Sequence, residues 1–387
     1  MTVLTRRAVL GAAGAAGALS LSGCAGFRAM SRPARDWNGL VQPIVEREIA
    51  AGHLPGAVVS IGQGGRRVFR RAYGLKSVEP VRAPLSAEAV FDFASLTKVV
   101  ATTPSVMALI EDGALKLDEP AARWWPAFAA NGKGSITVRQ LMTHVSGLAP
   151  DLDLTTPWNG EAQGLAMAAA SQPVRPAGEA FVYSDINFIV LAELVRQVSG
   201  LRVDAFAQKR VFGPLRMKDT LFRPSGAILR RVVPTARFER RILLGEAHDP
   251  TARRMGGVAG HAGLFSTAAD LERYARMLLN GGTLDGARVL RTQTVALMNA
   301  PEALPGGVKR ALGWDVSSAY SIGYDKAFSA SSFGHTGYTG AMVWIDPASR
   351  SWVISLTSRL HPDSQGDAKF LRHDLGAAVG AAIRAGG

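Results

Sequence analysis

Two pairs of strand-like segments at opposite ends of the chain constrain its fold most strongly. Residues 57–61 and 68–73 have the composition of two strands joined by a Gly-rich turn, and residues 341–345 and 352–357 form a second pair around an Asp-Pro turn. From about residue 114 to 325 the pattern is mainly that of helices and Pro/Gly loops. We therefore predict an α+β fold, in which one antiparallel β-sheet built from N- and C-terminal segments is flanked by helices and carries an inserted, mainly helical lobe.

The length and composition of the chain are sufficient for a large core. The 387 residues are 47% hydrophobic and 19% charged, which is typical of a globular protein. We predict a single domain over residues 37–387, preceded by a tether over residues 24–36 and a signal peptide over residues 1–23. A cleft between the sheet and the helical lobe is the expected place for a site.

The first 24 residues have the features of an export signal. Arg6 and Arg7 precede a short Ala/Gly-rich apolar run that ends at Leu21-Ser22-Gly23-Cys24. The pattern resembles a bacterial lipoprotein signal, in which the cysteine is acylated, and Cys24 is the only cysteine of the chain. The twin arginine resembles a Tat signal, with an ordinary positively charged signal region as the alternative. We expect a protein that is exported and anchored to a membrane through lipid on Cys24, facing the periplasm or the cell exterior.

The formal net charge of +13 favours anionic surroundings. For an exported protein these are the membrane surface and the polymers of the cell wall. The sequence has no Lys/Arg run interleaved with aromatic residues and no zinc-ligand spacing, so we expect no nucleic-acid partner, no metal and no other cofactor.

Ser95-Leu96-Thr97-Lys98 is the first candidate for chemistry. A strand-like segment ends at Ala94, and apolar residues at helical spacing follow Lys98, although Pro104 predicts an irregular turn near Thr103. Residues three apart share a helix face, so the amine of Lys98 can reach the oxygen of Ser95 and, if uncharged, accept its proton. Ser95 would then be a covalent nucleophile. The alternative is a capping serine at a helix start, followed by a surface lysine.

Two further segments make the short Ser95–Lys98 pattern much more specific for one family of proteins. Tyr183-Ser184-Asp185 lies just before an apolar helical segment, and His335-Thr336-Gly337 lies just before the C-terminal strand pair. With these segments in this order, the chain resembles the serine β-lactamase and penicillin-binding protein family over roughly residues 40–380. The similarity is greatest to class C-type β-lactamases, D-alanyl-D-alanine carboxypeptidases and related esterases. No Gly-x-Ser-x-Gly pattern is present, which argues against an α/β-hydrolase.

The resemblance implies roles for particular residues. Ser95 would attack the carbonyl and form an acyl-enzyme. Lys98 would accept the proton or hold Tyr183 as a tyrosinate, and Tyr183 would relay a proton to the leaving group and later activate water. The backbone amides of Ser95 and Tyr338 would form the oxyanion hole. First-turn amides of a helix lack internal partners and attract negative charge, which supports the first of these two donors independently.

Two residues of the substrate-binding segments depart from the β-lactamase pattern. Asp185 stands where many relatives have Asn, and an ionised carboxylate cannot donate to a substrate amide. Near Lys98 it would also favour the charged amine, which shifts general-base duty toward Tyr183. His335, beside Thr336 and Gly337, stands where relatives have Lys, and we expect it to be a weaker cation. Penicillin is therefore not the expected substrate.

Three function hypotheses follow. The first is a β-lactamase-related serine hydrolase of the cell envelope that cleaves a small ester or amide through an acyl-enzyme on Ser95. The second is a D-alanyl-D-alanine carboxypeptidase acting on cell-wall peptide. The third is a non-catalytic envelope-binding lipoprotein, against which the intact catalytic elements count.

Other histidines have plainer interpretations. His144 is read as a structural residue at the end of a helix. His248 and His261 flank the Gly-rich segment 256–260, which lacks the Gly-Lys-Ser/Thr of a phosphate-binding loop. The sequence leaves open whether this segment borders a pocket or lies on the surface.

Overall fold

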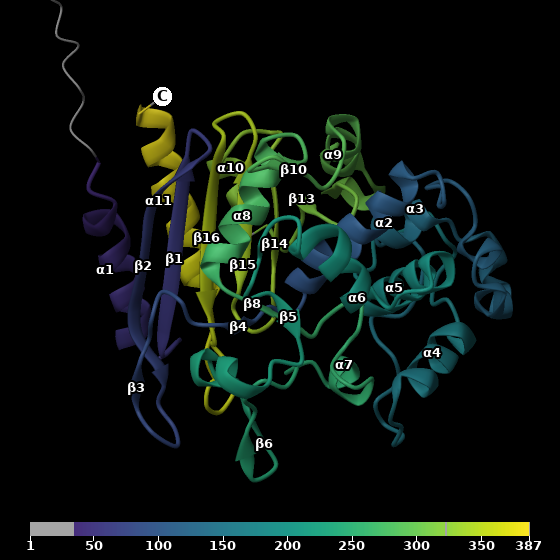
Figure 1. Ribbon diagram of the computed structural model, residues 1–387, viewed down its shortest axis with the longest axis horizontal. Coiled ribbons are helices and arrows are strands. Elements are labelled where there is room, and N and C mark those ends of the chain that lie inside the picture. The colour runs from purple at the N-terminus through teal and green to yellow at the C-terminus, as the bar shows by residue number, and fades with distance from the viewer. Residues whose placement is uncertain (1–34, 322, 387) are drawn as a thin grey trace, which may run out of the picture. The chain divides into compact units, whose positions relative to one another are not determined.

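The two predicted strand pairs meet in one antiparallel sheet (Figure 1). The computed structural model describes residues 35–321 and 323–386, and in this part of the chain the sheet has nine strands in the order β11-β12-β13-β14-β15-β16-β1-β2-β3. The strands are β1 (Gly56–Gln63), β2 (Arg66–Ser77), β3 (Ala83–Pro84), β11 (Glu302–Ala303), β12 (Lys309–Arg310), β13 (Asp315–Ser317), β14 (Phe333–Thr336), β15 (Met342–Asp346) and β16 (Ser351–Thr357). The predicted fold class is confirmed.

The contact between β1 and β16 closes the fold, because it joins segments almost 300 residues apart. Their register runs from Ala57 opposite Thr357 to Gly62 opposite Trp352. Gly62 has a specific reason to be glycine. A Cβ at this position would lie 2.2 Å from the indole of Trp352, so only a residue without a side chain lets the two strands pair.

The central strands β1 and β16 are buried on both faces, which explains their nearly continuous apolar sequence. Side chains of β1 alternate between two cores. Val59 and Ile61 pack with the terminal helices α1 and α11, whereas Val58 faces the core shared with α8 and the helical lobe. The helices are α1 (Trp37–Ala50), α2 (Thr103–Glu111), α3 (Val138–Met142), α4 (Glu161–Ala170), α5 (Asp185–Ser199), α6 (Val203–Ala207), α7 (Pro250–Arg254), α8 (Ala268–Leu279), α9 (Thr292–Asn299), α10 (Tyr324–Ala327) and α11 (Lys369–Gly386).

The inserted lobe ends earlier than predicted. Strands β11, β12 and β13 lie inside the expected range of 114–325 but extend the main sheet. These strands have only two or three residues each, too few to show a period-2 pattern. The lobe also contributes to a small sheet in which β4 (Phe91–Asp92) and β5 (Leu221–Phe222) flank β8 (Leu264–Ser266).

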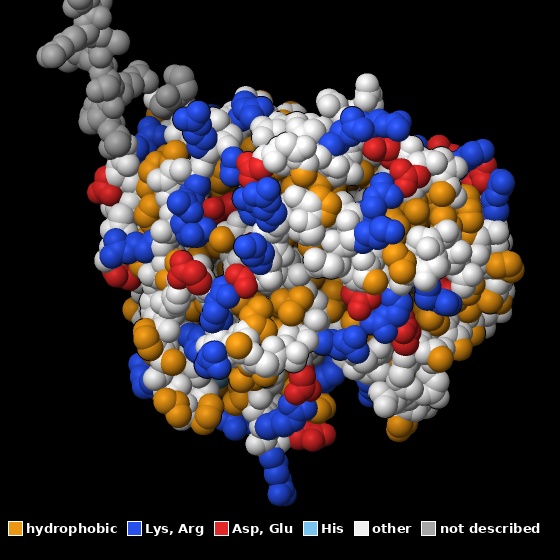
Figure 2. Space-filling view, in the orientation of Figure 1, with side chains coloured by type: hydrophobic (Ala, Val, Ile, Leu, Met, Phe, Trp, Pro, Cys, Tyr) orange, Lys and Arg blue, Asp and Glu red, His pale blue; other side chains and the backbone are white. Residues whose placement is uncertain are grey.

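Residues 37–387 form one compact unit. Figure 2 shows Lys and Arg side chains distributed over much of the displayed face of this unit. No described helix combines the length and the apolar character needed to cross a membrane. The predicted signal peptide and Cys24 lie outside the described residues, so these predictions remain predictions.

Candidate active site

Ser95 follows a tightly held turn after β4. Ala94 has a positive φ of 44°, an uncommon conformation for a residue with a side chain. Two hydrogen bonds hold it: its amide donates to Asp92 Oδ1 at 2.8 Å, and its carbonyl accepts from Thr97 Oγ1 at 2.6 Å. Ser95 itself is half-buried. The turn places the hydroxyl group of Ser95 at the start of the following helical segment.

The irregular turn predicted from Pro104 is present. Residues 98–102 form a π-helical turn, and Pro104 lies in the first turn of α2, where its missing N–H is tolerated. The proline therefore separates two helical segments and does not break one. Lys98, the first residue of the π-helical turn, lies on the same side as Ser95.

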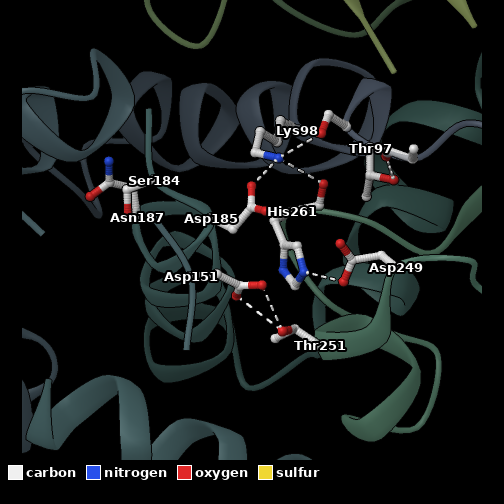
Figure 3. A network of polar contacts seen from close by, with 12 residues as sticks. Thr97, Lys98, Asp151, Ser184, Asp185, Asn187, Asp249, Thr251 and His261 are labelled. Atoms are coloured by element: carbon white, nitrogen blue, oxygen red, sulfur yellow. Dashed lines mark hydrogen bonds and ion pairs between the residues drawn. The ribbon is translucent and has the colours of Figure 1, made fainter. Parts of the chain in front are cut away.

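Lys98 is completely buried and contacts three oxygen atoms (Figure 3). Its Nζ lies 3.1 Å from Ser95 Oγ, 2.6 Å from Asp185 Oδ1 and 3.1 Å from the carbonyl oxygen of His261. Lys98 Nζ donates hydrogen bonds to Ser95 Oγ and to the His261 carbonyl, and Asp185 is its ion-pair partner. Burial by itself lowers the pKa of Lys98, but the negative charge of Asp185 contributes most to outweighing burial and raising it. Lys98 is therefore an ammonium group in the resting site.

Tyr183 lies over the same ammonium group. Lys98 Nζ is 5.0 Å from the centre of the phenol ring, and the ring stacks on His144 with centroids 4.4 Å apart. Burial raises the pKa of the Tyr183 hydroxyl, while Lys98 and a hydrogen bond with Ser95 work in the opposite direction. The net direction is upward, so Tyr183 is a neutral phenol at rest.

His144 supports Tyr183, a role that the sequence did not reveal. It follows α3 with a positive φ of 60°, and its Nδ1 accepts from the Ser184 amide and from Asn187 Nδ2, both at 3.1 Å. The interpretation as a residue at a helix end describes its backbone correctly. Stacking on Tyr183 depends on tertiary contacts between segments 40 residues apart, and no local pattern contains that information.

Asp185 and His335 are the two residues that depart from the β-lactamase pattern, and Asp185 lies beside Lys98 as its expected effect on the amine requires. Asp185, the first residue of α5, points toward Lys98. It is not among the residues that line the cavity in front of Ser95, which is described below. Substrate contact by Asp185 remains a prediction. His335 is buried, and burial together with the positive charges of Arg310 and Lys98 lowers its pKa well below the ordinary value. Its Nδ1 donates to the Thr336 carbonyl at 2.8 Å. His335 is thus a neutral imidazole, which agrees with the expectation that it is a weaker cation than lysine.

The turn after β14 lies against the turn that precedes Ser95. A Cβ on Gly337 would lie 2.5 Å from the carbonyl oxygen of Phe93, so glycine is required for this close approach. Thr339 Oγ1 donates to the carbonyl of Asp92 at 2.8 Å. These contacts bring Tyr338 next to the Ser95 turn. In residues 35–321 and 323–386, no backbone carbonyl accepts from the amide of Ser95 or of Tyr338.

A second buried ion pair lies next to Lys98, and the sequence did not predict it. His261 Nε2 is 2.9 Å from Asp249 Oδ1, and Figure 3 shows the imidazole between Asp249, Asp185 and Asp151. Burial disfavours the charged forms of His261 and Asp249, but their mutual attraction outweighs it. The attraction raises the pKa of His261 and lowers that of Asp249. The Gly-rich segment 256–260 leads into His261, whose carbonyl accepts from Lys98, but none of its residues lines the cavity in front of Ser95.

The spacing of Asp185, Asp249 and His261 also raises the question of a metal. Each offers a donor atom within 4.8 Å of the other two. However, Lys98 already supplies a cation to Asp185, and Asp249 engages the imidazole. A divalent cation would have to displace both contacts, so we interpret the group as an ion-pair network.

A cavity of about 760 Å³ opens in front of Ser95. Tyr183, His335, Thr336, Gly337 and Tyr338 line it, so the structure brings these predicted residues together around the nucleophile. Four basic and two acidic side chains also line the cavity. The basic ones are Arg310, Arg359, Lys369 and Arg372, and the acidic ones are Asp315 and Asp367. The cavity lining therefore carries an excess of basic over acidic side chains.

The fold, the contact of Ser95 with the buried Lys98 and the adjacent tyrosine are those of a serine hydrolase. A family model described as Beta-lactamase matches residues 39–377, and the chain belongs to the β-lactamase family. The predicted resemblance is confirmed.

Two curated relatives and one solved structure illustrate the family. The chain is 30% identical over 358 residues to an N-acetylmuramyl-L-alanine amidase of Bacillus subtilis, covering 83% of this chain and 80% of the relative. It is 25% identical to a putative D-alanyl-D-alanine carboxypeptidase of Escherichia coli, covering 82% and 81%. A penicillin-binding protein homologue from Caulobacter crescentus has the same fold, with a TM-score of 0.73, 22% identity and coverage of 90% and 98%.

Proposed function

We propose that this protein hydrolyses an amide or ester bond through an acyl-enzyme on Ser95, and that its substrate is an amide of the bacterial cell wall. One observation carries the proposal. Ser95 Oγ lies 3.1 Å from the Lys98 ammonium, at the wall of a large cavity whose basic side chains favour an anionic substrate. The name of the relative from Bacillus subtilis supports an amide of the muramyl type.

The charge state of the site determines which group takes the proton of Ser95. Lys98 has no lone pair while it is an ammonium group paired with Asp185, so it cannot accept a proton in that state. Tyr183 can do so once it has lost its own proton, and the Lys98 ammonium stabilises the phenolate. Ser95 then attacks the carbonyl, and Tyr183 passes the proton to the leaving nitrogen or oxygen. Water repeats the sequence on the acyl-enzyme.

The two amides without carbonyl partners supply the oxyanion hole in this proposal. Negative charge develops on the substrate carbonyl oxygen, and preorganised N–H donors stabilise that charge. Ser95 provides one donor and Tyr338 the other, because Gly337 allows the two turns to approach. Arg372 Nη2 fixes the position of the second turn by donating to the Gly337 carbonyl at 2.7 Å.

The Gly337→Ala variant is expected to lower kcat/KM by about 100-fold, because a methyl group against the Phe93 carbonyl displaces the Tyr338 amide. The measurement is steady-state kinetics on a p-nitrophenyl ester. Gly134→Ala is the matched control, since its Cβ would meet only Ala129 at 3.8 Å. Equal kinetics for Gly337→Ala and the wild type would contradict the assignment of this turn.

The pH dependence follows from the charge states. Because burial raises the pKa of Tyr183, little phenolate is present at neutral pH, and its fraction grows about tenfold per pH unit below that pKa. We expect kcat/KM to rise between about pH 6 and pH 9. The raised pKa of Lys98 keeps it charged over this range, and His335 stays neutral, so neither causes the rise.

The Tyr183→Phe variant tests this prediction in the same pH series. It should lose most of the activity and also the alkaline rise. A rise that survives in this variant would assign the titration to another group, of which His261 is the first to test.

The reaction products distinguish an amidase from a D-alanyl-D-alanine carboxypeptidase, which is the strongest alternative. The name of the relative from Escherichia coli favours a D-alanyl-D-alanine carboxypeptidase. Purified protein is incubated with a muropeptide carrying both bonds, and the products are identified by mass spectrometry. Release of the whole peptide from muramic acid supports the amidase, whereas release of D-alanine alone supports the carboxypeptidase. Cleavage of p-nitrophenyl esters without either product would leave only the esterase.

The proposed location is the cell envelope, with lipid on Cys24 as the anchor. The lipoprotein-like sequence around Cys24 supports it. When membranes are washed at high salt, which screens charge-based surface binding, Cys24→Ala should move the protein from the membrane fraction to the soluble fraction. Unchanged fractionation would defeat the proposed anchor without affecting the proposed chemistry.

A further inference from the structure

A second cavity, of about 620 Å³, is lined by two segments that are distant in the sequence. One wall is the segment from Lys76 to Ala83. The other runs from Leu229 to Leu244 and includes the hairpin of β6 (Arg237–Phe238) and β7 (Arg241–Ile242). Figure 1 shows this hairpin projecting from the rest of the domain. We call this cavity and its hairpin the hairpin groove.

Specific contacts hold the two walls together. Lys76 Nζ donates to the Arg230 carbonyl at 2.8 Å. The His361 ring lies between the walls: its Nε2 accepts from the Val78 amide at 3.0 Å, and its Nδ1 donates to the Thr235 carbonyl at 3.0 Å. These hydrogen bonds fix the two walls relative to each other, so the groove is a defined feature of the folded domain.

The groove carries a strong excess of positive charge. Its lining contains five basic residues and one acidic residue: Lys76, Arg230, Arg237, Arg240 and Arg241, with Glu79. Arg237 pairs with Glu79, and Arg241 pairs with Glu246. Arg230 and Arg240 are exposed, and no carboxylate in the described part of the chain forms an ion pair with either. Two guanidinium groups are thus available to anions outside the protein.

Large apolar side chains are exposed beside these arginines. Val81 is 70% exposed on one wall, and Leu244 and Phe238 are 44% and 39% exposed on or next to the hairpin. Figure 2 shows basic and hydrophobic side chains close together at this end of the displayed face. Basic groups next to exposed apolar side chains on a projecting element are typical of surfaces that insert into a membrane interface.

From these observations we infer that the hairpin groove binds the surface of a membrane containing anionic lipids. Arg230 and Arg240 contact the lipid phosphates, while Val81, Phe238 and Leu244 enter the boundary of the acyl chains. The charge complementarity favours this occupant over a protein partner, because anionic bilayers combine dense negative charge with an apolar layer directly beneath it. The lining of this groove shares no residue with the lining of the catalytic cavity.

The test is co-sedimentation of the full-length chain with vesicles of phosphatidylcholine alone or mixed equally with phosphatidylglycerol. All variants keep the same N-terminal segment, so its contribution is constant. The charge-reversed variant Arg230→Glu/Arg240→Glu should bind the mixed vesicles on the order of 100-fold more weakly than the wild type. Val81→Asp/Leu244→Asp should also weaken binding by at least about tenfold, because the apolar contact is lost.

The control Arg66→Glu/Arg288→Glu makes the same change in net charge at exposed positions elsewhere. If it weakens binding as much as the groove variant does, net charge alone is responsible and the inference is overturned. The inference also fails if free glycerol phosphate at lipid-equivalent concentration displaces the protein, since the groove would then bind small anions. A tryptophan introduced as Phe238→Trp should shift its fluorescence to shorter wavelength on mixed vesicles, and an unchanged spectrum would contradict insertion.

Two further measurements keep this result separate from the proposed catalysis. The groove variants should unfold at the same temperature as the wild type and react with a fluorophosphonate at Ser95 at the same rate. A variant that loses both vesicle binding and its folding transition is replaced by Arg240→Gln, which removes one exposed charge without reversing it. If this folded variant binds the mixed vesicles as tightly as the wild type, the inference is overturned.

Discussion

Ser95→Ala is expected to lower kcat/KM on any amide or ester substrate by about 10,000-fold or more, because the acyl-enzyme cannot form without the hydroxyl. Substrate binding should change little, since the cavity keeps its other lining residues. The measurement is steady-state kinetics, together with equilibrium binding of an intact substrate to the inactive variant. Ser199→Ala, at the last residue of α5, is the matched control and should retain full activity.

Residual activity of the Ser95→Ala protein decides between mechanisms. A loss of less than about tenfold would show that Ser95 is not the nucleophile, because removal of a true nucleophile costs several orders of magnitude. Contamination by a host hydrolase is excluded when the residual activity co-purifies with the variant.

Lys98→Met is expected to abolish activity and also to destabilise the protein by about 3 kcal/mol, because it leaves the Asp185 carboxylate without its cation in a largely buried site. Methionine is chosen because its length is close to that of lysine and the site is completely buried. Chemical denaturation measures the free energy of unfolding, and ester hydrolysis measures the activity.

The double variant Lys98→Met/Asp185→Asn separates the two effects. Removing both charges should recover most of the lost stability, since no ion is left unpaired. Activity should stay lost, because the proposed mechanism needs a cation beside Ser95 and Tyr183. If the double variant is as unstable as Lys98→Met, the ion pair is not the cause of the instability. If Lys98→Met stays active, the proposed role of Lys98 is wrong.

The main sheet could be predicted because its central strands are long and apolar and flanked by turn residues. β1 and β16 are buried on both faces, which gives uninterrupted apolar segments that are recognisable without any partner. The short strands β11 to β13 could not be predicted in the same way. They pair because β13 can add to the free edge of β14, and that edge forms only after the N- and C-terminal segments have assembled into the sheet.

The catalytic segments were predictable for a different reason. Ser95 and Lys98 lie one helical turn apart, so local geometry brings them together. The remaining contacts of Lys98 come from Asp185 and from the carbonyl of His261, which are distant in the sequence. The same holds for the low pKa of His335, which results from burial and from Arg310. Residue type showed which groups could act, and only tertiary structure determined their charges.

The most direct test of the central claim is the site of covalent modification. The protein is incubated with a fluorophosphonate that carries no charge, digested, and mapped by mass spectrometry. We predict one adduct, on the peptide that contains Ser95, and none on the Ser95→Ala protein. An adduct on another residue, or no adduct on a protein that turns over an ester, would contradict the proposal that Ser95 is the nucleophile.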